Sequence, residues 1–191
     1  MARALGNGEY VVSGKVKVSK EEFIEVLLHW VASHLSRKGI KQDAKVLDMM
    51  KKGKEMFGLN LSKREELNKL HLELTTLNLW IVIAVCESRF RDVEQLNDYL
   101  DIFNKRFFDQ VLKDTVEDYE QWMEFLEVKH DEYREAMKTC TGKDLMALGE
   151  LIQSNLYGER YPDAILNLQI VIYVGEGIKA LGKALDQYEI E

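Results

Sequence analysis

The chain has 191 residues, of which 46% are hydrophobic and 31% charged, a globular composition that can form a core without disulfide or metal staples. Its net charge of -7 argues against nucleic acid as the main partner, because neutralising phosphates requires clustered cations. The longest apolar run, Leu79–Cys86, is much shorter than the roughly 20 residues of a membrane-spanning helix, and the N-terminus lacks the apolar core of a signal peptide. We therefore expect a cytoplasmic protein that does not enter a membrane.

Charge is unevenly distributed along the chain. Residues 1–60 carry 11 Lys/Arg against 7 Asp/Glu, whereas residues 61–191 carry 15 against 26. A basic patch lies at Arg37–Lys54 and an acidic block at Asp92–Glu135. One interpretation is that the basic patch and the acidic block are two helix faces exposed to solvent. The other is that these two faces contact each other within one molecule or across a dimer.

Residues 1–18 differ from the rest, because β-branched and polar residues alternate around Ser13-Gly14. This pattern predicts a small hairpin or a flexible tail, since an isolated two-stranded hairpin is only marginally stable. Residues 19–191 carry helix signals almost without a break, and the one proline, Pro162, suits the first turn of a helix. We expect a single all-α domain at residues 19–191.

About seven helices are predicted in this domain. Ser19 with Glu22 and Ser62 with Glu65 have the spacing of capping boxes, which mark helix starts. Apolar residues then recur three and four apart, as on the buried face of an amphipathic helix. The expected helices span about residues 19–39, 41–57, 62–90, 92–114, 115–140, 144–156 and 162–188.

An unusual dodecamer occurs twice. Leu77–Ser88 and Leu166–Gly177 are identical at eight of twelve positions. We interpret the chain as an internal duplication with copies at about residues 19–100 and 115–189, each containing three helices. A pseudo-symmetric bundle of this kind needs two central helices that are apolar on every side. The two matched asparagines near the start of each dodecamer are expected to form interhelical hydrogen bonds.

A duplicated helical bundle also allows a dimetal hypothesis. Ferritin-like carboxylate sites take Glu from two helices and Glu-x-x-His from two others, and Glu127-x-x-His130 resembles that motif. Val31 stands where the first copy would need its Glu, so the resemblance is incomplete. The candidate ligands for iron, manganese or zinc are Glu127, His130, His34, Glu87 and Glu176. The alternative is that the histidines are core residues and that the protein needs no cofactor.

One further motif resembles a known family. Arg64 and His71 are separated by six residues, which is similar to the Arg-x(4–6)-His motif of HEPN-type ribonucleases. That resemblance implies that both side chains act in phosphodiester cleavage. The alternative is a solvated Arg near a helix start and a partly buried His.

The leading functional hypothesis is a non-enzymatic helical scaffold or interaction protein, either homo-oligomeric or bound to a protein partner. The sequence contains no Gly-rich phosphate loop, no nucleophile elbow and no cysteine spacing typical of a metal site. An aromatic stripe is expected to extend from the core to a partner surface. Its members are Tyr99, Phe103, Phe107 and Phe108. The alternatives are a metal-dependent bundle enzyme and a protein that holds a small apolar ligand between its repeats.

Overall fold

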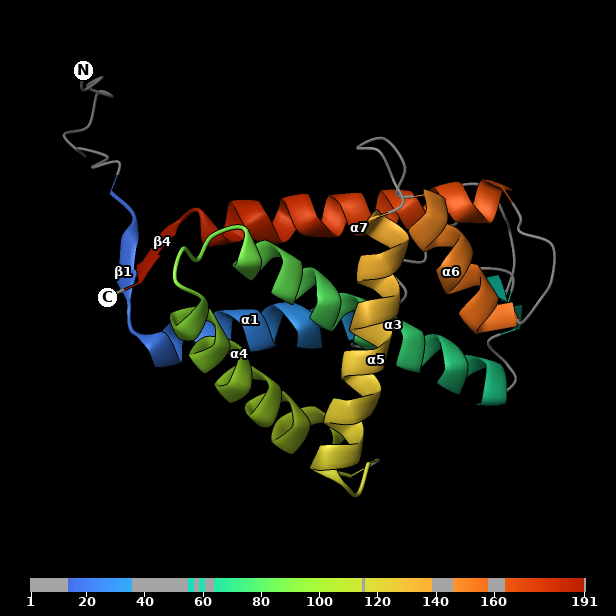
Figure 1. Ribbon diagram of the computed structural model, residues 1–191, viewed down its shortest axis with the longest axis horizontal. Coiled ribbons are helices and arrows are strands. Elements are labelled where there is room, and N and C mark those ends of the chain that lie inside the picture. Colours follow the sequence, from blue (N-terminus) through green and yellow to red (C-terminus); the bar gives the residue numbers. More distant parts are fainter. Residues whose placement is uncertain are drawn as a thin grey trace, which may run out of the picture.

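The computed structural model describes residues 14–35, 55–56, 59–60, 64–114, 116–138, 146–157 and 164–190 (Figure 1). This part of the chain is mostly helical, which confirms the all-α prediction. Its helices are α1 (Lys20–Leu35), α3 (Arg64–Glu87), α4 (Val93–Phe107), α5 (Tyr119–Lys138), α6 (Met146–Tyr157) and α7 (Ala164–Leu185).

Several helices begin where local hydrogen bonding predicts. The Ser19 amide donates to Glu22 Oε2 at 2.8 Å and the Glu22 amide donates to Ser19 Oγ at 3.3 Å, which confirms that capping box. Asp92 accepts from two amides of the first turn of α4, and Asp118 does the same for α5. These side chains satisfy backbone donors that a helix start leaves without partners.

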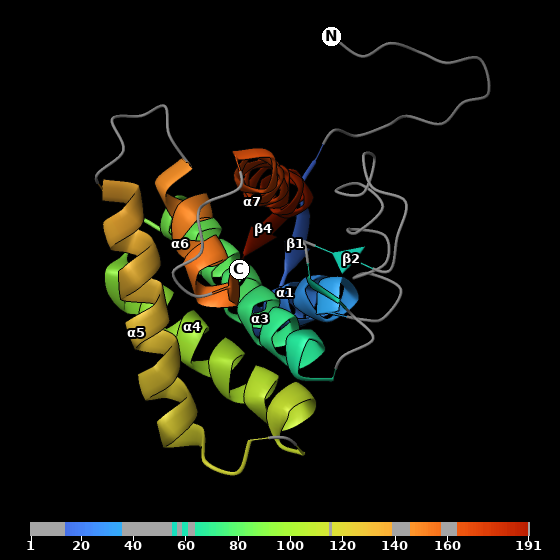
Figure 2. The ribbon, with the colours of Figure 1, turned by 90° about the vertical axis from the view of Figure 1, so that its right-hand side faces the viewer.

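Helix α3 is the centre of the fold. It packs against α1, α4, α5, α6 and α7, as the two ribbon views also show (Figures 1 and 2). Its second half is buried on every side from Leu74 to Ile83, which explains why the sequence there is apolar around the whole helix. The first dodecamer is therefore a central helix, as predicted.

Two short strand pairs accompany the helices. Strand β1 (Val16–Val18) runs parallel to β4 (Tyr188–Ile190), with Val16 paired to Tyr188 and Val18 to Ile190. The prediction of a hairpin within residues 1–18 is therefore wrong for Val16–Val18, because this strand pairs with β4 instead. This pairing also ends α7 at Leu185, short of the predicted 188. Residues 1–13 lie outside the described residues.

Two further predictions differ from the structure. Most of the helix expected at 41–57 lies outside the described residues, but its end, Glu55–Met56, is strand β2, paired antiparallel with β3 (Leu59–Asn60). The helix expected at 92–114 changes at Phe107 into a π-helical turn, η1 (Phe108–Leu112). The widened turn buries both Phe108 and Leu112.

The second dodecamer differs most from its prediction. Leu168 and Ile172 on α7 are 52% and 46% exposed, whereas the matched Leu79 and Ile83 on α3 are 0% and 7% exposed. Helix α7 lies along one side of the molecule (Figures 1 and 2) and continues past Glu176, whereas α3 ends at the matched Glu87. The prediction of a second central helix is therefore wrong, because the two similar apolar segments are covered to different extents.

Candidate functional site

A groove lies where α4 and α5 diverge from the connection at their shared end (Figure 1). Its volume is about 610 Å³, within the range of small-molecule sites. Each helix contributes polar residues one turn apart, a spacing that places them on one face. These are Asn97, Asp101 and Asn104 on α4, with Glu120, Glu124 and Glu127 on α5.

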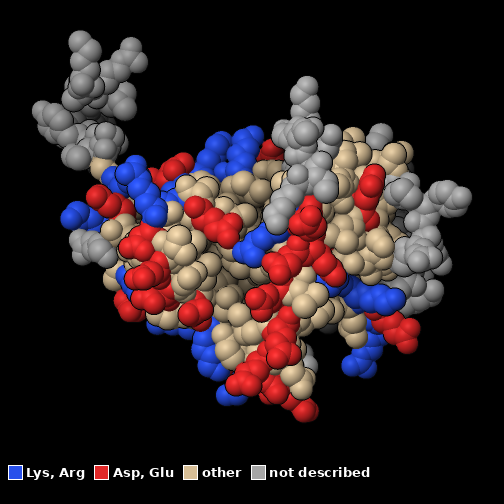
Figure 3. Space-filling view, in the orientation of Figure 1, with Lys and Arg blue, Asp and Glu red and all other residues tan. Residues whose placement is uncertain are grey.

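The rim of the groove is acidic and the interior is apolar. Figure 3 shows acidic side chains along the length of α5. The groove's four carboxylates form no ion pair with any residue that the structure describes; they are Asp101, Glu120, Glu124 and Glu127. Apolar side chains also line the groove, namely Ile83, Leu100, Met123 and Leu126. The groove therefore combines negative potential with an apolar surface.

Asn104 is one of two buried polar residues that line the groove, and the other is His130. The Asn104 side chain lines the cavity and is only 6% exposed, and its Oδ1 atom has no hydrogen-bond partner. A buried acceptor that lacks a partner costs about 1–3 kcal/mol. Asn104 Oδ1 is thus a buried acceptor without a hydrogen-bond partner among the described residues.

Arg134 closes one end of the groove. Its guanidinium donates to Glu87 Oε1 and to Asp131 Oδ1, both at 3.2 Å. Its charge is therefore already shared between two carboxylates, one on α3 and one on its own helix.

His130 connects the groove to the core. It lines the groove, is buried, and its Nε2 lies 3.4 Å from the Thr76 carbonyl oxygen on α3. A carbonyl oxygen only accepts, so Nε2 carries the proton. Burial lowers the pKa of His130 to about 4, so the imidazole is neutral at physiological pH.

A buried polar network that the sequence analysis missed lies behind His130. The Tyr133 hydroxyl donates to Glu73 Oε1 at 2.8 Å and is hydrogen-bonded to Thr76 Oγ1 at 3.0 Å. Asn155 on α6 donates to the same Glu73 oxygen at 3.0 Å. Burial raises the pKa of Glu73, the hydrogen bonds from Asn155 and Tyr133 opposing that shift.

This network joins α3, α5 and α6. Glu73, Thr76 and Tyr133 are buried and do not line the groove, so their arrangement suits helix packing rather than contact with a ligand. The sequence did contain a signal for it. Glu73 lies three residues after Leu70 and four before Leu77, on the apolar face of its helix, where an ionisable residue requires partners.

The structure does not bring the five metal candidates together at one point. Glu127 and His130 share the groove, whereas Glu87 pairs with Arg134 and Glu176 with Lys179. The His34 ring stacks on Trp30 and its Nδ1 bonds the Trp30 carbonyl oxygen at 2.8 Å. Among the described residues, no three His, Cys, Asp or Glu side chains lie close enough together to hold a metal ion.

The two residues of the ribonuclease-like motif lie on α3. Arg64 is its first residue, and His71 follows two turns later on the same face; both are exposed. Although His71 keeps an exposed surface, the neighbouring protein atoms partly desolvate its imidazole and lower its pKa. Neither residue lines the groove between α4 and α5.

The aromatic interaction candidates are all buried. Tyr99 packs edge-on against Phe23 of α1 with ring centroids 5.9 Å apart, and Phe103 stacks with Phe107 at 6.3 Å. Phe108 packs edge-on against Tyr119 at 5.2 Å. The stripe therefore stays within the core, contrary to the expectation that it extends to a partner surface, because α1 and the start of α5 cover it.

One asparagine of the repeated pair bonds across helices as expected. Asn78 Nδ2 donates to the Tyr173 hydroxyl on α7 at 2.9 Å. Asn167 instead packs against Gly149 of α6, and its Oδ1 has no hydrogen-bond partner. The prediction is thus confirmed for Asn78 alone.

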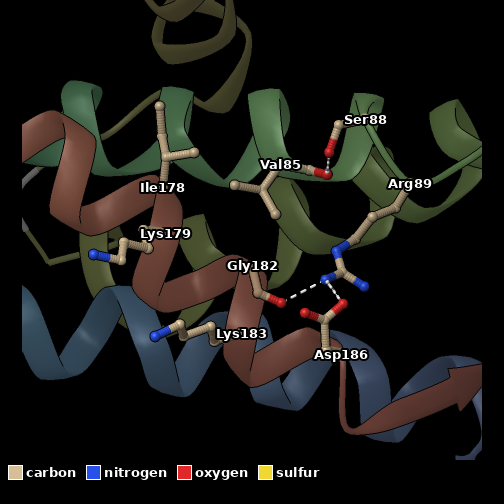
Figure 4. A pocket seen from close by; sticks show the side chains of 8 residues that line it. All are labelled: Val85, Ser88, Arg89, Ile178, Lys179, Gly182, Lys183 and Asp186. Carbon is tan, nitrogen blue, oxygen red and sulfur yellow. Dashed lines mark hydrogen bonds and ion pairs between the residues drawn. The ribbon is translucent and has the colours of Figure 1, made fainter.

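A second cavity lies between the end of α3 and the C-terminal half of α7 (Figure 4). Its volume is about 450 Å³, and Arg89 donates there to the Gly182 carbonyl oxygen and, at 2.6 Å, to Asp186. Lys179 and Lys183 point away from Arg89 (Figure 4). The cations do not converge on one point, so we assign no ligand to this cavity.

Within the part of the chain that the structure describes, two helical segments are long and apolar enough to cross a membrane by length and composition, Asn68–Glu87 and Ala164–Leu185. In the first, 78% of the apolar window is buried within the fold, as in the core helix of a globular protein. In the second only 28% is buried, and the exposed apolar residues include Ile165, Leu168 and Ile172. We call these three side chains the α7 face.

Comparisons of this chain with protein-family models, with curated proteins and with solved structures return no match.

Proposed function

We propose that this protein is a non-enzymatic helical interaction protein that self-associates through the α7 face. The observation that carries the proposal is the exposure of Ile165, Leu168 and Ile172, which are 60%, 52% and 46% exposed on one side of a single helix. Their spacing of three and four residues makes one continuous stripe. Contiguous exposed apolar stripes mark interaction surfaces.

The repeated dodecamer supports this proposal. The α7 face corresponds to Thr76, Leu79 and Ile83 on α3. There Thr76 bonds to Tyr133 of α5, and Ile83 lines the groove with residues of α4 and α5. Leu79 and Ile83 are thus buried in the first dodecamer, whereas the matched Leu168 and Ile172 are 52% and 46% exposed in the second. This difference is expected if a helix from a second molecule packs on Leu168 and Ile172.

The stripe is self-complementary in an antiparallel arrangement. A two-fold axis near Leu168 would place Ile165 of one chain opposite Ile172 of the other and bring the two Leu168 side chains together. The next turns of α7 carry Glu176 and Lys179, which provide charges of both signs beyond the apolar contact. A closed dimer, rather than an open chain of molecules, follows from this symmetry.

Sedimentation equilibrium at micromolar concentration tests the proposal. We expect the wild-type protein to be a dimer and Leu168→Glu to be monomeric, because a buried unpaired carboxylate opposes association. Val128→Glu on α5 is the matched control, since Val128 is an apolar residue of similar exposure, 59%, that lies outside the α7 face, and this variant should remain dimeric. A monomeric wild-type protein would overturn self-association, and co-flotation of that monomer with lipid vesicles would assign the α7 face to a membrane surface instead.

We also propose that the chain arose by duplication of a three-helix unit. The support is the pair of dodecamers, which lie in α3 and α7, two helices that pack on each other. An experimental structure of the full chain tests this proposal, with residues 19–87 expected to superpose on 115–176 in the same helix order. A different helix order in the two segments would contradict it.

A further inference from the structure

We draw no further inference here: the strongest candidate, the groove between α4 and α5 with its apolar wall and acidic rim, rests on exposed carboxylates, and no second group among the residues that the structure describes points to a ligand there.

Discussion

Gly149 on α6 lies directly against Asn167 on α7, and a Cβ atom at Gly149 would overlap Asn167 Oδ1. The two helices pack closely along their length. Glycine is therefore needed at position 149 for close approach, not for an unusual backbone conformation. Gly182, further along α7, has nothing within 4 Å of the position where a Cβ atom would lie.

The two glycines give a matched prediction at the scale of single residues. Gly149→Ala should lower the free energy of unfolding by about 1–3 kcal/mol, because α6 and α7 must separate to fit the methyl group. Gly182→Ala should raise it by up to about 1 kcal/mol, since alanine is the better helix former. Urea denaturation of both variants measures these changes. Equal stability of the two variants would show that α6 and α7 do not approach closely at Gly149.

At the scale of helices, the starts of α1 and α4 were predictable because capping depends on residues two or three apart in sequence. Helix α5 begins at Tyr119, four residues after the predicted 115, and Asp118 caps it. The role of Glu73 was harder to predict, because its partners Tyr133 and Asn155 are 60 and 82 residues away. The π-helical turn at Phe108–Leu112 had no sequence signal that we can identify. The groove itself was not predicted. Of its residues, only Glu127 and His130 were named from the sequence, as metal ligands, and the others depend on how α4 and α5 diverge.

The Glu73 network should contribute to stability mainly through hydrogen bonds. Glu73→Leu should lower the free energy of unfolding by about 2 kcal/mol or more, because Asn155 loses its acceptor and Tyr133 loses one of two partners. Glu73→Gln retains the accepting oxygen and should cost less than about 1 kcal/mol. Urea denaturation at neutral pH compares the two variants. If Gln is as destabilising as Leu, the network needs the carboxylate charge and not just its oxygen.

At the scale of the whole molecule, the repeated dodecamer shows what an apolar segment does and does not determine. Both copies form helices, because their composition and length favour that structure. Leu79 is nevertheless buried and Leu168 exposed, because α3 lies between the other helices and α7 lies along their side. Residues shared by the two dodecamers do not specify how many helices pack around each, and this is why the second central helix was predicted wrongly.

The free energy of unfolding of the whole molecule should decrease in acid, partly because His130 is buried in its neutral form. Burial lowers its pKa to about 4 in the fold, against 6.5 for an ordinary histidine, with Arg134 and Asp131 as nearby charges of opposite effect. Between these pH values the unfolded chain binds a proton that the folded protein does not, so the free energy of unfolding falls as pH decreases. We expect this effect to reach about 3 kcal/mol between about pH 7 and 4 and to be absent from His130→Leu.

Glu73 has the opposite effect on the free energy of unfolding. Its raised pKa makes the folded state bind a proton that the unfolded chain does not bind at a pH above the ordinary carboxyl pKa. The comparison is therefore best repeated in a Glu73→Gln background by urea denaturation across this pH range. Parallel pH profiles with and without His130 in that background would show that this imidazole is not kept neutral by the fold.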